Sequence, residues 1–205
     1  MKILSLQVGP IGTNCYIFCD EAGKVCGVVD PGGEPDRVAA AVESTGCVPA
    51  AILLTHGHYD HTGGVAGLRE KYPQLPVYLN ARDQFPDGSR KLLQLFPFLG
   101  NTTDYDDGDT VRLGGLAVSV LATPGHSAGS VTLLCGQTMF AGDTLFAGSC
   151  GRMDLEGGDE EAMRTSLARL GNLEGDFQVL PGHMDASTLE RERAYNPYLR
   201  QAMGR

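Results

Sequence analysis

The sequence of 205 residues has no run of lysine or arginine, and its formal net charge is −9 at pH 7. A protein that binds nucleic acid or an anionic membrane through charge needs a basic surface, so we expect neither partner. No apolar segment approaches the length of a secretory signal or a membrane span, which predicts a cytoplasmic protein. The composition is otherwise that of a globular protein, with 42% hydrophobic residues.

The six cysteines include no Cys-x-x-Cys pair, which removes the usual signature of a zinc ribbon. Cys15, Cys19 and Cys135 lie in apolar, strand-like runs, and we predict that they are small buried side chains. Cys150 differs because it lies in the glycine-rich stretch 147–152. We expect it near the functional site but assign it no chemical role.

Histidine is sparse as well, with five in the chain, yet three of them fall within six consecutive residues. His56, His58 and His61 accompany Asp60 directly after the apolar run 50–54, which we predict to be a buried strand. Imidazole and carboxylate groups together suit a cation such as zinc or iron. In an extended loop His56 and His58 point to the same side, and a turn at Asp60 and His61 can aim a second pair at a neighbouring point. One loop could therefore serve two adjacent metal ions.

The other two histidines and one aspartate occur in a similar context. His126, Asp143 and His183 each follow an apolar, strand-like segment within a short glycine-containing loop. A loop at the end of a strand is where a rigid scaffold can hold a ligand for catalysis. Because this context recurs, we predict that these residues share a metal site with the cluster 55–61.

Apolar periodicity and turn residues predict a succession of strands and helices. Strands are expected at 3–8, 14–19, 25–29, 50–54, 77–79, 110–113, 116–121, 130–135, 138–141 and 177–180. Helices are expected at 34–46, 64–72 and 159–170 and from near 187, while the segment 82–98 contains a helix-like run and could be a lid over the site. Two strand-rich halves, each ending in a strand and a helix, predict an α/β fold in which two sheets pack face to face between helices.

These motifs resemble those of the metallo-β-lactamase fold hydrolases and, within them, the glyoxalase II (hydroxyacylglutathione hydrolase) group. The cluster 55–61 matches the family's cluster, and its later ligands match His126, Asp143 and His183 in order. The similarity extends to the segments 12–16, 30–33 and 151–155 and so covers nearly the whole chain. The resemblance implies an αββα sandwich of two mixed β-sheets in a single domain that spans residues 1–205.

The resemblance also implies two divalent metal ions, with zinc as the first choice and iron or manganese as alternatives. One ion would be held by His56, His58 and His126, the other by Asp60, His61 and His183, and Asp143 would bridge them. Asp60 and Asp143 would thereby be catalytic residues as well as ligands. Two such ions can hold a hydroxide that attacks a carbonyl, and they can stabilise the oxyanion that forms.

The implied substrate is a small molecule, a thioester derived from a thiol, such as S-lactoylglutathione. A thiolate leaves without a strong general acid, and the motif has no evident acid beside it. In glyoxalase II a basic residue after the bridging aspartate, followed two positions on by a tyrosine, helps to bind the glutathione carboxylate. Arg152 matches the basic residue, but Asp154 stands at the tyrosine position. The chain resembles the short forms, and we expect no C-terminal helical glutathione-binding domain.

Other activities also deserve comparison. A persulfide dioxygenase, with one iron held by two histidines and an aspartate, resembles this pattern and is the main alternative. Ribonucleases of this fold would need an added domain and a basic surface, and a secreted β-lactamase would need a signal peptide. A non-catalytic binding module would be expected to lack some of the seven ligands, all of which are present. The complete second group of ligands favours hydrolysis.

Overall fold

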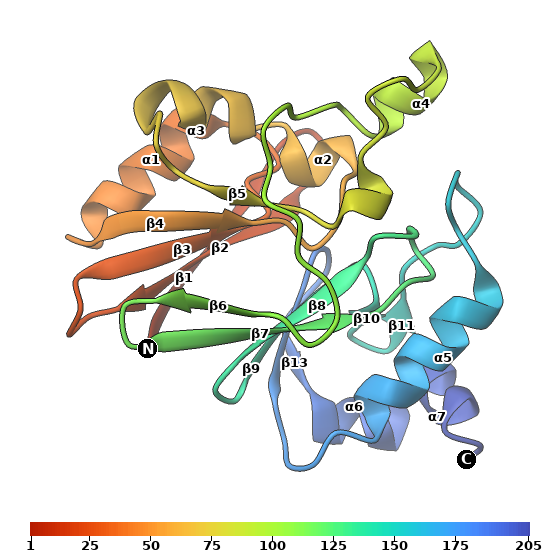
Figure 1. Ribbon diagram of the computed structural model, residues 1–205. Coiled ribbons are helices and arrows are strands. Elements are labelled where there is room, and N and C mark those ends of the chain that lie inside the picture. Colours follow the sequence, from red (N-terminus) through yellow and green to blue (C-terminus); the bar gives the residue numbers. More distant parts are fainter.

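The protein is described by a computed structural model that covers residues 1–205. Two mixed β-sheets pack face to face, and helices cover the outer face of each sheet (Figure 1). The predicted αββα sandwich is therefore confirmed. None of the helices combines the length and the apolar character that crossing a membrane requires.

The first sheet has the strand order β1-β2-β3-β4-β5. Its strands are β1 (Lys2–Val8), β2 (Thr13–Asp20), β3 (Val25–Val29), β4 (Val48–Leu53) and β5 (Val77–Tyr78). The first three form an antiparallel meander, whereas β3, β4 and β5 are parallel to one another. The connections between the parallel strands contain α1 (Pro35–Ser44) and α3 (Val65–Lys71), which pack apolar side chains onto the outer face.

The second sheet has the order β13-β12-β9-β8-β7-β6. Its strands are β6 (Thr110–Leu113), β7 (Leu116–Ala122), β8 (Val131–Cys135), β9 (Thr138–Gly142), β12 (Gln178–Pro181) and β13 (Ser187–Thr188). β12 is parallel to β9, and the other neighbours are antiparallel. The outer face is covered by α5 (Glu160–Gly171), α6 (Leu189–Tyr195) and α7 (Pro197–Ala202).

The strand β2 shows why the sequence of the inner strands is almost continuously apolar. Cys15, Ile17 and Cys19 pack beneath the helices of the first half. Tyr16 and Phe18 point the other way, into the core between the two sheets, where the Phe18 ring lies 5.2 Å from that of Phe140. Because successive side chains in a strand alternate between faces, a strand that is covered on both sides needs apolar residues at every position.

The predicted strands and main helices are confirmed, but several short elements were not predicted. They are the helix α2 (Tyr59–Thr62), the 3₁₀ helix η1 (Ala81–Asp83), the hairpin of β10 (Leu145–Phe146) and β11 (Ser149–Cys150), and β13. The helix-like run in the segment 82–98 is α4 (Arg90–Leu95), which buries none of its residues and projects from the body of the molecule (Figure 1). Cys15, Cys19 and Cys135 are buried, as predicted.

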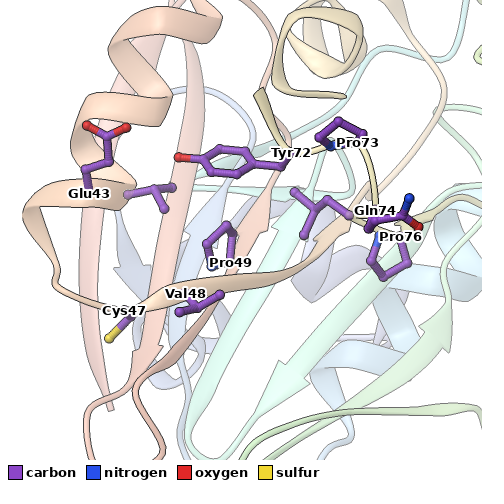
Figure 2. Close-up of a pocket in the computed structure, with 10 residues that line it drawn as sticks. Glu43, Cys47, Val48, Pro49, Tyr72, Pro73, Gln74 and Pro76 are labelled. Carbon is purple, nitrogen blue, oxygen red and sulfur yellow. The ribbon is translucent and has the colours of Figure 1, made fainter. Parts of the chain in front are cut away.

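An apolar groove of about 500 Å³ lies at the start of β4, the end opposite to the histidine cluster (Figure 2). It is bounded by the end of α1, the first residues of β4 and the turn 72–76. The Tyr72 ring crosses the groove, and its hydroxyl has no hydrogen-bond partner. The groove contains none of the predicted metal ligands.

Candidate metal centre

The candidate site lies where strands of both sheets end. Two of its histidines, His56 and His58, follow the end of β4, while Asp60 and His61 lie on the short helix α2. From the second sheet, His126 follows β7, Asp143 follows β9 and His183 follows β12. The structure therefore brings together all seven residues that the sequence predicted, in three overlapping groups of nearby ligand atoms.

The first group consists of His56, His58 and His126. His58 Nδ1 lies 3.1 Å from His56 Nε2 and 2.9 Å from His126 Nε2. His126 Nδ1 lies 2.7 Å from the carbonyl oxygen of Arg152, a bond in which the ring must donate. In the neutral ring, Nε2 is then the nitrogen with the lone pair, and it faces His58 Nδ1. Such a convergence of imidazole nitrogens suits a cation, as in zinc sites built from three histidines.

Burial keeps His56 and His58 in the neutral form that binds metals. It holds the pKa of His56 well below its usual range, with a further contribution from the neighbouring rings of His61 and His58. Burial and the adjacent His126 lower the pKa of His58 to about 3. Since a protonated imidazole has no lone pair to donate, these shifts prepare the group for a metal ion.

The second group consists of Asp60, His61 and His183. Asp60 Oδ2 lies 3.1 Å from His183 Nε2 and 3.3 Å from His61 Nε2. Burial alone would raise the pKa of Asp60, but the hydrogen bond from His183 and the adjacent His61 imidazole hold it well below its usual range. The carboxylate is thus ionised within the site, as a metal ligand must be.

Asp143 faces both groups. Its Oδ1 lies 3.5 Å from His61 Nε2, and its Oδ2 lies 3.5 Å from His126 Nε2. Asp143 Oδ1 and His61 Nε2 are both buried without a hydrogen-bond partner. Polar atoms buried in this way are costly unless something binds them, so their orphaned state fits a bound cation.

His61 lies among carboxylates that require positive charge. Burial alone would lower its pKa, but Asp143 and Asp30 raise it well above the usual range. Asp30 Oδ2 accepts a hydrogen bond from His61 Nδ1 at 2.9 Å, which leaves Nε2 directed at Asp143 and Asp60. A divalent cation would supply the positive charge that these acidic groups otherwise draw from a proton.

Several residues that position the ligands were not recognised in the sequence. Asp30, predicted only as part of a turn, also accepts hydrogen bonds from the backbone and hydroxyl of Thr55 at 2.7 and 2.6 Å. Thr13 Oγ1 donates to Asp60 Oδ2 at 2.9 Å, and Asn14 Nδ2 donates to two carbonyls of the loop that carries His183. The segments 12–16 and 30–33 resemble those of the family, which indicated that they matter to the site but did not reveal these hydrogen bonds.

A cavity of about 460 Å³ opens over the ligands. Its apolar lining includes Tyr59, Leu95, Phe146 and Leu155, so part of the wall comes from α4. Cys150 also lines the cavity, as expected from its sequence position, and burial raises the pKa of its thiol to about 11. The thiol therefore stays protonated at neutral pH and is a poor nucleophile.

Arg152 lies at the rim of this cavity, with its side chain 60% exposed. Its guanidinium forms a two-bond ion pair with Asp154, with both nitrogen–oxygen distances at 2.7 Å. Asp154 stands where the resemblance implies a tyrosine. It therefore forms an ion pair with Arg152, the residue that was predicted to bind substrate.

A two-sheet sandwich with a His/Asp cluster at its strand ends defines a class of metallohydrolase fold. The pattern of the Metallo-beta-lactamase superfamily matches residues 8–183, and this chain belongs to that superfamily. The family binds divalent metals through a His/Asp cluster of this kind.

Two related sequences bear on the activity. The "Probable metallo-hydrolase YqgX" of Bacillus subtilis is 35% identical over 97% of this chain and 98% of the relative. A "Hydroxyacylglutathione hydrolase" of Photorhabdus laumondii is 36% identical over 82% of this chain but only 60% of the relative. The similarity to glyoxalase II is therefore partial, whereas that to the metallo-hydrolase extends over nearly the full length of both chains.

Solved structures are similar over nearly the whole chain. The BLEG-1 B3 metallo-beta-lactamase has a TM-score of 0.85 at 32% identity, covering 97% of this chain and 99% of the other. TTHA1623 in a di-iron-bound form has a TM-score of 0.81 at 38% identity, covering 95% and 99%. ETHE1 from Myxococcus xanthus has a TM-score of 0.79 at 28% identity, covering 96% and 84%.

Proposed function

We propose that this protein is a metal-dependent hydrolase that cleaves a small-molecule thioester. The observation that carries the proposal is the position of Asp143, whose two carboxylate oxygens each lie 3.5 Å from a histidine of a different ligand group. A site in which one carboxylate faces two groups of ligands suits a pair of adjacent metal ions.

In this proposal the ligands keep the assignment made from the sequence. His56, His58 and His126 would hold one ion, Asp60, His61 and His183 the other, and Asp143 both. Two divalent ions at these positions would activate water as a nucleophile near neutral pH and polarise the carbonyl that it attacks. Zinc and iron both suit these nitrogen and oxygen donors.

The chain's own residues would bind and orient the substrate. The apolar walls formed by Tyr59, Leu95 and Phe146 would exclude water around the scissile bond. Thr13 Oγ1 donates a hydrogen bond to Asp60 Oδ2 at 2.9 Å, which helps to hold this ligand carboxylate in place. Apart from the proposed metal ligands Asp60 and Asp143, the cavity lining contains no carboxylic acid. This absence favours a leaving group such as a thiolate, which departs without a strong acid.

Hydrolysis of S-lactoylglutathione by purified protein, followed through loss of thioester absorbance, tests the proposal. The protein is assayed as isolated, after treatment with a chelator, and after reloading with zinc or iron. We expect turnover that disappears with the chelator and returns with metal. A neutral thioester of the same acyl group would show whether the glutathione moiety contributes.

A metal-loaded protein that leaves every tested thioester intact would contradict this proposal. Oxygen consumption with glutathione persulfide would then test the alternative, oxidation of a persulfide at a single iron. The complete Asp60, His61 and His183 group favours hydrolysis over that reaction, because a single iron held by two histidines and an aspartate does not require it.

A further inference from the structure

We propose that Asp83 is a positioning residue for the group His56, His58 and His126, because its single carboxylate joins the two loops that carry these histidines. The inference rests on the metal centre proposed above, but it does not depend on which substrate is hydrolysed.

Asp83 is the last residue of η1 and is 2% exposed. Its Oδ2 accepts hydrogen bonds from the backbone N–H of Gly57 at 2.9 Å and from the hydroxyl of Ser127 at 2.6 Å. Its Oδ1 accepts a hydrogen bond from the backbone N–H of Gly129 at 2.7 Å. Three donors from two loops therefore converge on one buried carboxylate.

The positions of these donors link Asp83 to the ligands. Gly57 stands between His56 and His58, whereas Ser127 follows His126 directly. The 2.9 Å separation of His58 Nδ1 and His126 Nε2 depends on how these two loops are placed relative to each other. Asp83 sets that placement, since it is hydrogen-bonded to both.

The glycines in both loops leave room for this contact. A Cβ atom at Gly57 would lie 2.8 Å from the Cβ of Asp83, and one at Gly129 would lie 2.7 Å from its Cγ. Non-bonded carbon atoms do not approach so closely, so a side chain at either position would force the neighbouring atoms to shift. The loops are therefore shaped for Asp83 as well as hydrogen-bonded to it.

The segment that carries Asp83 touches the same group at a second point. Phe96 is 1% exposed, and its ring lies 4.5 Å from the ring of His58. Asp83 and Phe96 thus anchor the two ends of a segment whose middle, α4, is not buried. Because both of its ends are anchored, this projecting segment can lie beside the site without disturbing the positions of the ligands.

Both side-chain oxygens of residue 83 must act as hydrogen-bond acceptors, and a carboxylate provides an acceptor at each. In Asp83→Asn one oxygen becomes an NH₂ group, which can only donate and so cannot accept a backbone N–H. One backbone N–H, that of Gly57 or that of Gly129, therefore loses its acceptor and faces a donor instead, although the side chain keeps its size. Loss of a group that orients metal ligands typically costs about 10–100-fold in metal affinity.

Asp104 provides a matched control. Its Oδ1 accepts a hydrogen bond at 2.7 Å from the N–H of Ala81, in the same turn, but it is exposed and has no hydrogen bond to a ligand loop. Asp104→Asn changes the same chemical group near the same turn. Any effect on the turn alone should therefore appear in both variants.

The test is titration of the metal-free proteins with cobalt(II) alone, followed by the visible spectrum and by the number of ions bound. In Asp83→Asn we expect affinity for one ion to fall about 10–100-fold while the other ion binds with an unchanged spectrum. Asp104→Asn should bind both ions as the wild type does. Because no substrate is present, the result is independent of thioester hydrolysis.

Two results would overturn the inference: unchanged affinity for both ions in Asp83→Asn, or equal weakening of both ions. Thermal unfolding of the metal-free variants shows whether they are folded before titration. If Asp83→Asn does not fold, Ser127→Ala decides the question, because it removes one donor and leaves the carboxylate in place. It should weaken the same single ion by a smaller factor, and unchanged binding of that ion would reject the role of Asp83.

Discussion

The two halves of the molecule supply their ligands in different ways. The first sheet contributes His56, His58, Asp60 and His61 from one continuous stretch at the end of β4. The second sheet contributes His126, Asp143 and His183 from three separate loops. The first set is brought together by local chain geometry, whereas the second exists only once β7, β9 and β12 have assembled. The contribution of the second half therefore depends on the whole fold.

The halves also differ in how firmly the ligands are held. His61 is fully buried and bonded to Asp30, which also binds the residue before His56. The side chain of His183 is 22% exposed, and its imidazole has Asp60 as its hydrogen-bond partner. Buried, hydrogen-bonded ligands are better oriented for a metal than exposed ones. His183 should accordingly be the more labile ligand of the two.

The largest effect should come from Asp143, the residue at which the two ligand groups meet. Asp143→Ala removes the carboxylate that faces both His61 and His126, and we expect it to abolish the binding of both ions and all hydrolysis. Metal content of the purified variant, measured by elemental analysis, checks this. Two ions retained per chain would disprove the bridging assignment.

A smaller, selective effect should separate the two ligand groups. His126→Ala should remove the ion of the first group and His183→Ala the ion of the second. Loss of a ligand should exceed the ~10–100-fold cost of losing a ligand's hydrogen-bond partner. We expect the greater loss for His126, because water can more readily replace the exposed His183. Calorimetric titration with zinc measures both, and the opposite order would contradict the difference inferred between these two histidines.

The smallest effect should be at Arg152, which lies at the rim and not among the ligands. An exposed ion pair contributes little to binding, so Arg152→Ala should raise KM for S-lactoylglutathione up to about fivefold with little change in kcat. Asp154→Asn should lower KM by a similar factor, because it releases the guanidinium. A neutral thioester serves as the control. If KM for glutathione thioesters stays constant in both variants, Arg152 has no part in substrate binding.

The two halves also differ in how far their strands and ligands could be predicted from sequence. The strands follow from apolar patterns, and the ligands of the first half from the density of histidine between 56 and 61. The ligands of the second half were predictable only because each follows a strand in a similar loop. Sheet order and the approach of the two sheets depend on contacts between distant residues, which no local pattern contains.

The supporting carboxylates show where prediction from sequence stops. Asp30 lies in an Asp-Pro-Gly-Gly stretch that predicts a turn, and Asp83 lies in a segment interpreted as a lid. Their roles come from loops that meet them across 25 to 46 positions of the chain. The helix α2 was missed for another reason, since four residues are too few to show a helical period.

Residue 152 combines two functions that can change independently. Its carbonyl oxygen orients His126, while its side chain extends to the rim of the cavity. Any amino acid at this position supplies the same carbonyl. Descendants of one ancestral enzyme could therefore replace the side chain, and with it the preferred substrate, while inheriting an unaltered metal centre. Libraries randomised at 152 and 154 should accordingly be rich in folded, metal-loaded proteins and diverse in specificity.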